Sequence, residues 1–261
     1  MKPLVRFTWA LFVTNLKSAI ALRGAFLMQA LFMVLNNVVF FTFWWVLLAR
    51  VPDIRGWQLR DMQLLFGITA TSYGLVVAFA GGVRELGRFI DEGALDTLLT
   101  QPKPTLLYAA GLHSRASGFG DVASGACFII ASGYVGWANA PVVGLAVAAG
   151  AVTFLGAGIL FFSLPFWLSR SETVSRQAWE LILTFALYPE PLFGGAMRLL
   201  LFTLLPAGIV SYLPVDMVRH PSVAGVLMTL AAAAMYLALA VWTFKRGLTR
   251  YASGSRFVVF G

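Results

Sequence analysis

Charged residues are scarce in this sequence. Asp, Glu, Lys and Arg make up 11% of its 261 residues, whereas hydrophobic residues make up 59%. Soluble domains carry about 25% charged residues, so this composition excludes a soluble globular protein. It predicts an integral membrane protein, and the net charge of +8 is then no sign of nucleic-acid binding.

Cysteine, histidine and the common catalytic motifs are also nearly absent. Cys127 is the only cysteine, which excludes an intrachain disulfide, and its apolar neighbours predict a small buried side chain. His113 and His220 lie too far apart for metal-ligand spacing. No P-loop, H-E-x-x-H or G-x-S-x-G motif occurs, and no G-x-x-x-G helix-pairing motif occurs either. We therefore expect no enzyme activity, no metal and no cofactor on this chain.

Long uncharged stretches dominate what remains. A membrane-spanning helix needs about 20 mostly apolar residues. We predict six such helices, over residues 24–49, 62–83, 112–136, 142–168, 174–189 and 221–244. The fifth is short because Pro189 ends it. The expected fold is a single all-α membrane domain over residues 1–261.

The N-terminal stretch 2–23 has a different character. Lys2, Arg6 and Lys17 fall within an arc of roughly 60° at helical spacing. This pattern predicts an amphipathic helix on the membrane surface before the first span. The alternative is a leading extension of that span.

The stretch 190–218 is apolar but repeatedly broken. The residues that mark it are Pro189, Glu190, Pro191, Arg198, Pro206, Tyr212 and Pro214. We predict re-entrant half-helices at the outer leaflet, because irregular backbone at membrane depth needs cover from protein or water. An ion pair between Glu190 and Arg198 is expected there.

The distribution of Lys and Arg predicts the orientation. If both termini lie in the cytoplasm, fourteen of the 19 basic residues face inward and five face outward. The positive-inside rule favours this arrangement. The segment 84–102 then lies on the cytoplasmic side.

That segment is a short charged, amphipathic island. Its polar residues include Arg84, Glu85, Arg88, Asp91, Glu92 and Asp96, and its apolar residues are Leu86, Phe89, Ile90, Leu95, Leu98 and Leu99. Each apolar set follows i, i+3, i+4 spacing, which predicts two short helices separated at Gly93. The segment is expected to lie on the membrane surface or to bind a soluble partner. The plainer interpretation is a solvated loop with amphipathic ends.

The order of these features resembles the ABC-2 type permeases, in particular a subgroup of about 260 residues first catalogued as a domain of unknown function. The most specific part is E-G-x-L-D-x-L-L-x-x-P, from Glu92 to Pro102. The run from Pro206 to Tyr212-x-Pro214 and the tail G-L-x-R-Y-x-S at 247–253 are also similar. Glu190 departs from the pattern, which has an apolar residue there.

The resemblance implies the membrane subunit of an ATP-binding cassette exporter in the cell's inner membrane. The ATPase would be a separate polypeptide, present in two copies, that holds ATP and Mg. A second permease, identical or paralogous, would complete the path. Segment 84–102 would contain the coupling helix, with Leu86, Phe89 and Ile90 as an apolar ridge for the ATPase and charged residues around it. The N-terminal helix would brace the same ATPase.

Two other functions fit the sequence. An ion-coupled secondary transporter could use the acids Asp121, Glu180 or Glu190, although we find no internal repeat between residues 1–130 and 131–261. A membrane protein with a purely structural or assembly role is the third. For Asp121 the plainer expectation is that it caps or pairs with Arg115 at the foot of the third span.

Overall fold

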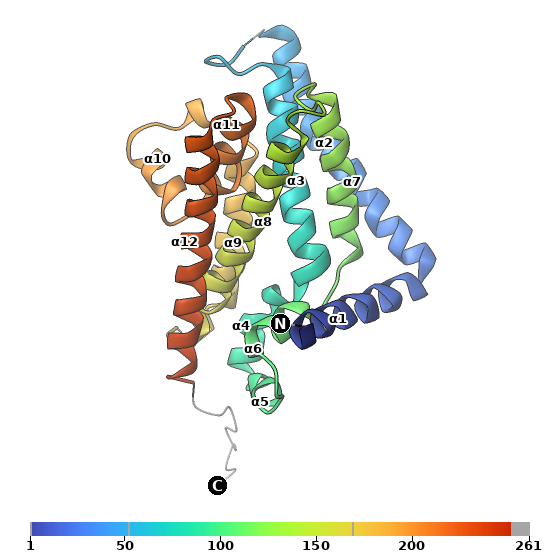
Figure 1. The fold of residues 1–261 in the computed structure, drawn as a ribbon, viewed down its shortest axis with the longest axis vertical. Helices are drawn as coiled ribbons and strands as arrows, with labels where there is room; N and C mark the ends of the chain where they lie inside the picture. The colour runs from blue at the N-terminus through green and yellow to red at the C-terminus, as the bar shows by residue number, and fades with distance from the viewer. Residues whose placement is uncertain (1, 52, 169, 252–261) are drawn as a thin grey trace.

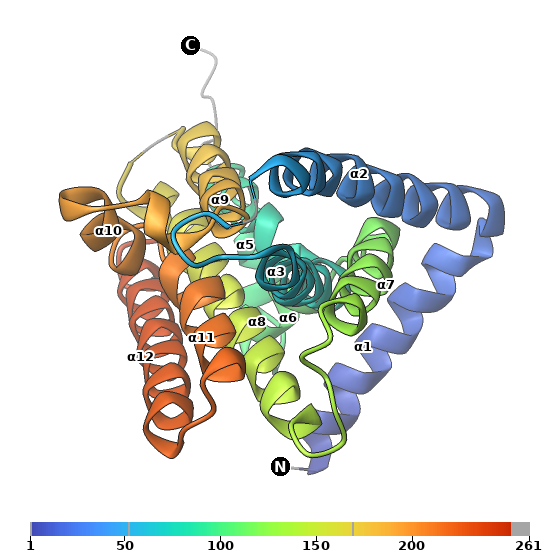
Figure 2. The ribbon, with the colours of Figure 1, turned by 90° about the horizontal axis from the view of Figure 1, so that it is seen from above.

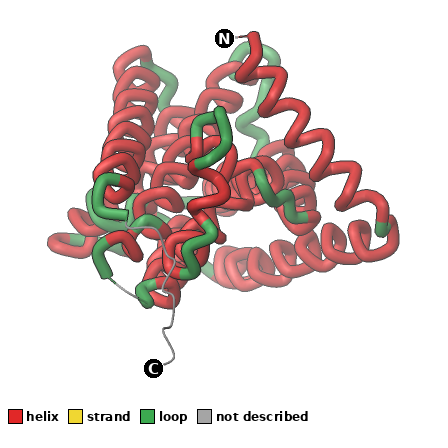
Figure 3. The backbone as a smooth tube through the Cα atoms, turned by 90° about the horizontal axis from the view of Figure 1, so that it is seen from below, coloured by secondary structure: helices red, strands yellow, loops and turns green. Residues whose placement is uncertain are grey.

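The computed structural model describes residues 2–51, 53–168 and 170–251. Their regular structure is helical (Figure 3). The longer helices are α1 (Lys2–Ala21), α2 (Arg23–Arg50), α3 (Leu59–Ala80), α7 (Ala116–Ala131), α8 (Ala140–Phe162), α9 (Glu172–Ala186) and α12 (Val223–Leu248). The shorter ones are η1 (Gly81–Glu85), α4 (Leu86–Asp91), α5 (Leu95–Leu99), α6 (Thr105–Gly111), η2 (Leu164–Phe166), η3 (Glu190–Leu192), α10 (Gly195–Phe202), the π-helix η4 (Gly208–Tyr212) and α11 (Leu213–Arg219).

Four helical stretches in the described part of the chain are long and apolar enough to cross a membrane. They are Arg23–Arg50, Leu59–Asp91, Ala140–Phe166 and Val223–Leu248. The 16 residues of α7 and the 15 of α9 rise only about 24 Å and 22 Å. The hydrocarbon core is roughly 30 Å thick, so the count of six spans stays a prediction.

The long helices form a bundle around α3, with short elements gathered at its two ends (Figures 1 and 2). One end carries α4, α5, α6 and the C-terminal end of α12, and α1 lies across it; we call this the α1 end. The opposite end carries the 53–58 loop, the 132–139 loop, α10 and α11; we call this the α11 end.

The centre of the bundle is the crossing of α3 and α7, which pack closely through glycines. A Cβ on Gly74 would lie 2.6 Å from the Gly118 carbonyl oxygen, and one on Gly125 would lie 2.7 Å from the Thr71 nitrogen. Gly67 and Gly74 are seven residues apart, as are Gly118 and Gly125, so each pair lies on one helix face. Small residues that let backbones approach are typical of membrane helix contacts. The chain therefore packs two helices through small residues although it has no G-x-x-x-G motif.

Helix α2 is the least covered of the four helical stretches long enough to cross a membrane. Of its side chains only Phe41, Trp44 and Leu48 are buried. Phe41 packs edge-on against Phe66, with ring centroids 5.1 Å apart. Near its N-terminal end α2 touches α7, since a Cβ on Gly120 would collide with the Ala30 carbonyl oxygen.

The broken stretch 190–218 folds at the α11 end as two short helices, α10 and α11, joined through η4 (Figure 1). The expected ion pair is present, with Arg198 Nη2 2.7 Å from Glu190 Oε1. Tyr212 is buried, and its hydroxyl donates to the Phe185 carbonyl at 2.8 Å. That bond ties η4 to the end of α9.

One side chain lies on the opposite side from its prediction. Cys127 is exposed on α7, not buried. The apolar sequence around it indicated burial, but α7 is covered on the side that faces α2 and α3, and Cys127 lies off that side.

Candidate functional site

The charged segment 84–102 continues directly from α3. The backbone breaks at Ala80 (φ −133°, ψ 29°), passes through η1 and enters α4. Gly93 has φ +75° and separates α4 from α5, in the place expected for it. Such a φ favours glycine, which has no Cβ to clash.

Most apolar side chains of this segment point inward, including Leu86 and Ile90 of the predicted outward ridge. Leu86 and Ile90 are 0% and 7% exposed, and Leu95 and Leu98 are 0% and 6% exposed. They pack into the chain's own bundle, where α4 rests on η2: a Cβ on Gly87 would lie 3.5 Å from Pro165 Cγ. The expectation that Leu86 and Ile90 form an outward ridge is therefore wrong, because the permease itself buries that face.

The outward face of the segment is mostly polar. Its exposed side chains are Arg88, Asp91, Glu92, Thr97, Leu99, Thr100, Gln101, Pro102 and Lys103. Phe89 is half-buried, with the Arg88 guanidinium 5.9 Å from its ring centroid, and Asp96 is also half-buried. Partial burial raises the pKa of the Asp91 carboxyl, and the Arg170 backbone N–H acts in the opposite direction. A partner that binds here would meet charged and polar side chains around the exposed apolar side chain of Leu99.

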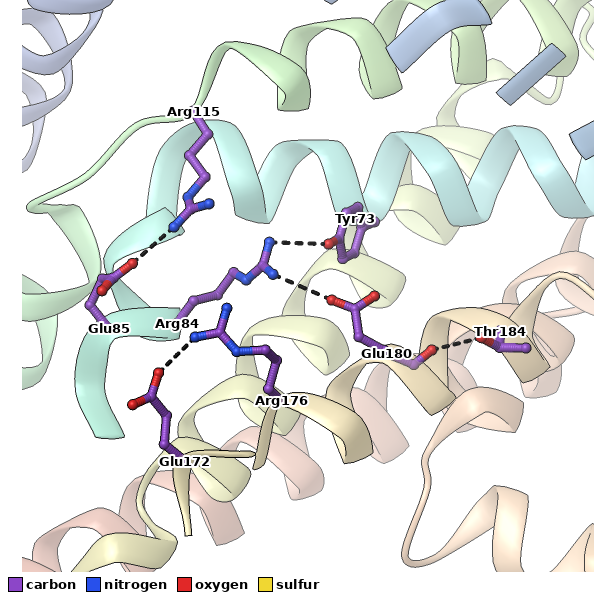
Figure 4. Close-up of polar contacts among 8 residues, drawn as sticks. All are labelled: Tyr73, Arg84, Glu85, Arg115, Glu172, Arg176, Glu180 and Thr184. Atoms are coloured by element: carbon purple, nitrogen blue, oxygen red, sulfur yellow. Dashed lines mark hydrogen bonds and ion pairs between the residues drawn. The ribbon is translucent and has the colours of Figure 1, made fainter. Parts of the chain in front are cut away.

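Two adjacent residues at the start of the segment connect it to other helices (Figure 4). Glu85 accepts from Arg115, at the N-terminal end of α7, at 2.9 Å, and forms an ion pair with Arg88 at 3.1 Å. Arg84 reaches Glu180 of α9 at 3.3 Å and the Tyr73 hydroxyl of α3 at 3.5 Å. We call these six residues the Arg84–Glu85 network. Since it joins η1 to α3, α7 and α9, a displacement of the segment must move or break contacts to all three.

Helices α6 and α1 support the segment from the side. Gly82 lies so close to α6 that a Cβ would collide with the Ala109 carbonyl oxygen. On the other face of α6, the Tyr108 ring lies 5.6 Å from the Phe7 ring of α1, and Lys103 Nζ lies 3.5 Å from the Phe7 centroid. The stretch 2–23 is helical over Lys2–Ala21. This helix packs on α6, which in turn contacts segment 84–102.

The predicted site residues fall into two separate groups. Segment 84–102 lies at the α1 end, and the residues marked from 189 to 214 lie at the α11 end (Figure 1). In the second group Pro189, Pro206, Tyr212 and Pro214 are buried, Glu190 and Pro191 are half-buried, and Arg198 is exposed.

One polar cluster at the α11 end was missed from the sequence. Asp61 is 2% exposed and accepts from the Tyr134 hydroxyl at 2.6 Å and from the Gln58 N–H at 2.8 Å. Arg219 Nε lies 3.1 Å from the same carboxylate, and its guanidinium lies 4.9 Å from the Trp57 ring centroid. The available signal was that Asp61 and Arg219 both flank predicted spans on the same side of the membrane.

The second missed cluster is inside the bundle. The expected pairing of Arg115 with Asp121 is wrong, because Arg115 reaches Glu85 instead. Asp121 is 2% exposed and accepts from Asn37 Nδ2 of α2 at 2.8 Å, and that nitrogen also donates to Ser124 Oγ at 2.9 Å. An asparagine in the middle of an apolar span was the signal for a partner across the helix pair.

Comparison with known proteins places this arrangement in a family. The sequence matches the family described as ABC-2 family transporter protein over residues 33–255, from within α2 to beyond α12. No curated protein and no solved structure matches the chain. The match covers most of the sequence. It includes segment 84–102, the Asp61–Arg219 pair and the Asn37–Asp121 pair. This all-helical, multi-pass membrane chain belongs to the ABC-2 transporter family.

Proposed function

We propose that the chain is the permease subunit of an ATP-driven exporter and that the outward face of segment 84–102 binds a separate ATPase. ATP and Mg belong to that partner, which is expected in two copies. A second permease, identical or paralogous, completes the translocation path. In this arrangement the chain lies in the inner membrane and has six spans, which are α2, α3, α7, α8, α9 and α12. Both termini lie in the cytoplasm.

The Arg84–Glu85 network is the observation that supports the proposal best. The segment presents a charged face outward and anchors Leu86 and Ile90 inside its own bundle. A force on the outward face is therefore not absorbed by a loose loop. It acts on α7 through Arg115 and on α9 through Glu180. Packed helices respond to such a force as rigid bodies, which is the motion that alternating access requires.

The supports around the segment fit the same role. Because α1 packs on α6 and α6 packs on η1, a partner on the α1 end meets a continuous surface of these elements. The exposed Arg6 and Lys17 of α1 add positive charge beside it. They would attract anionic lipid headgroups or acidic groups of the partner.

The proposal is tested by copurification of the ATPase with charge-reversal variants. The chain is extracted from its native membrane in mild detergent, and bound proteins are identified by mass. Wild type is expected to retain a P-loop ATPase, and Glu92→Arg is expected to lose most of it. Asp216→Arg is the control, because Asp216 is also an exposed acid and lies at the opposite end. Retention by Glu92→Arg, or loss by the control alone, would contradict the proposal.

Ion-coupled transport remains the second candidate, and one observation favours it: Asp121 is a buried acid with no basic partner among the described residues. The other two candidate acids are paired, Glu180 with Arg84 and Glu190 with Arg198. Ion coupling would therefore depend on Asp121 alone. Transport that needs an ion gradient and continues without any ATPase would establish this alternative.

A further inference from the structure

A cavity of about 270 Å³ lies between α2, α3, α7 and α9. Most of its wall is apolar and aromatic, with Met33, Phe40, Phe66 and Leu187 among the lining side chains. Its polar lining comes from Asn36, Asn37, Tyr73, Asp121 and Thr184. Ligand sites commonly combine an apolar wall with a few polar groups that fix the orientation of the ligand.

Asp121 is the one acid in this wall, and it is only half satisfied. Its Oδ1 accepts from Asn37 Nδ2, whereas its Oδ2 is buried and has no hydrogen-bond partner. The Ser124 hydroxyl beside it is already used, since it donates to the Gly120 carbonyl. A buried carboxylate oxygen without a donor is costly, so the site favours a ligand that brings one.

The surroundings of Asp121 select for a cation that is itself largely apolar. No Lys, Arg or His of the described chain lies within ion-pair distance of this carboxylate. Three aromatic rings, of Phe40, Phe66 and Tyr73, line the same cavity, and aromatic faces attract organic cations. A metal ion would find too few oxygen ligands here, because Ca²⁺ takes six to eight and Mg²⁺ about six.

We propose that this cavity binds the protonated amine of a small apolar or amphiphilic molecule, with Asp121 as its counter-charge. The ammonium lies against the Asp121 carboxylate in the cavity wall, and the hydrocarbon part lies against Phe40, Phe66 and Leu187. The volume suits a small amine or the head of a larger one, and it is too small for a glycan or a folded peptide.

The position of the cavity connects it to the α1 end. Thr184 lines it and also lines a second hollow along α9 that includes Arg176 and Glu180. An amine can therefore approach along α9 from that end. Tyr73 lines the cavity while its hydroxyl accepts from Arg84, so the wall of the site touches the Arg84–Glu85 network (Figure 4). The binding site itself goes beyond the proposed function and does not require an ATPase.

The test is a direct binding measurement on the purified full chain in lipid nanodiscs. Radiolabelled 4-phenylbutylamine is the probe, and unlabelled 4-phenylbutanol, which has the same hydrocarbon but no charge, is the competitor. We expect saturable amine binding to wild type, with the alcohol at least tenfold weaker as a competitor. Asp121→Asn should weaken amine binding at least tenfold, and the control Asp216→Asn should bind like wild type.

A second variant separates the site from any folding defect of the first. Leu183→Trp fills the cavity from α9 and leaves Asp121 in place, so it should abolish binding in protein that elutes and melts like wild type. The proposal is overturned if wild type shows no saturable binding or if Leu183→Trp binds normally. Equal competition by the alcohol, or unchanged binding to folded Asp121→Asn, overturns it as well. Since no ATPase is present, none of these results depends on the coupling proposal.

Discussion

At each end of the molecule one acid pairs with an arginine from a distant part of the chain, but the two pairs differ greatly in burial. At the α11 end the Asp61 side chain is 2% exposed and Arg219 is 19% exposed. At the α1 end the Glu85 side chain is 22% exposed and Arg115 is 43% exposed. Water screens the second pair far more than the first. We infer that the α11 end is held as a fixed joint, whereas the contacts at the α1 end can be exchanged when a partner moves the segment.

The largest effect on stability is expected when the buried acid, Asp61, is removed. Asp61→Ala leaves the Arg219 guanidinium and the Tyr134 hydroxyl without their acceptor, and breaking a buried pair costs about 3–5 kcal/mol. We expect a large fall in the thermal or denaturant stability of the detergent-purified chain. Glu85→Ala should cost much less, and equal losses in the two variants would contradict the difference between the ends.

The α3–α7 crossing connects the ends and should be the next most sensitive point. A Cβ on Gly118 would lie 2.6 Å from the Ala78 nitrogen, so Gly118→Ala overpacks a backbone contact. We expect a loss of about 1–3 kcal/mol in stability. Gly144→Ala is the matched control, since nothing lies within 4 Å of that position, and it should be neutral or slightly stabilising. A neutral Gly118→Ala would show that the two helices can separate without cost.

Neutralising Glu85, the less buried of the two acids, should separate stability from function. Glu85→Gln keeps the shape of the side chain but removes the charge that holds Arg88 and Arg115. Exposed ion pairs contribute about 0–1 kcal/mol, so we expect little change in stability. In the purified complex with its ATPase, the variant should alter the rate of ATP hydrolysis. An unchanged rate together with a large loss of stability would make Glu85 a structural residue like Asp61.

The smallest effect is expected for the outermost pair. The Arg198 side chain is 62% exposed, and its partner Glu190 is 25% exposed. Arg198→Ala should leave melting temperature almost unchanged, because water and salt already screen this pair. The comparison is made at low and at high salt, and a clear loss at both would show that the Glu190–Arg198 contact fixes α10 in place.

Much of the helix content follows from the sequence. Uncharged runs ended by Arg, Pro or Gly place α2, α3, α8 and α12 within a few residues of their observed bounds. The third predicted range, 112–136, is longer than α7 inside it, because residues around Leu112 and Tyr134 are apolar yet lie in connections. The fifth range, 174–189, begins two residues after α9 begins and ends three residues after α9 ends. Hydropathy does not distinguish a buried loop from a helix end.

The partner against which the apolar face of α4 packs could not be predicted from the sequence. The spacing of Leu86 and Ile90 placed them correctly on one side of a helix, but spacing does not say what that side meets. A groove on a partner and the chain's own bundle both bury an apolar face. Burial against η2 and α8 decided the matter in this structure.

The polar clusters required contacts between distant parts of the chain. Asp61 and Arg219, Asn37 and Asp121, and Arg84 and Glu180 come from helices far apart in sequence. No spacing rule relates such residues, and each pair forms only once the helices have packed. The glycines of α3 and α7 are an intermediate case, because their seven-residue spacing is visible in the sequence but means little until the two helices are known to cross.

The most direct test of the central claim is site-specific photo-crosslinking in native membranes. A photo-crosslinking amino acid is placed at position 92 on the outward face of the segment, and in a second sample at position 216 on the α11 end. If segment 84–102 binds the ATPase, position 92 gives an adduct with a P-loop ATPase and position 216 gives none. An ATPase adduct from position 216, or none from position 92 while the ATPase copurifies with the chain, would contradict the account.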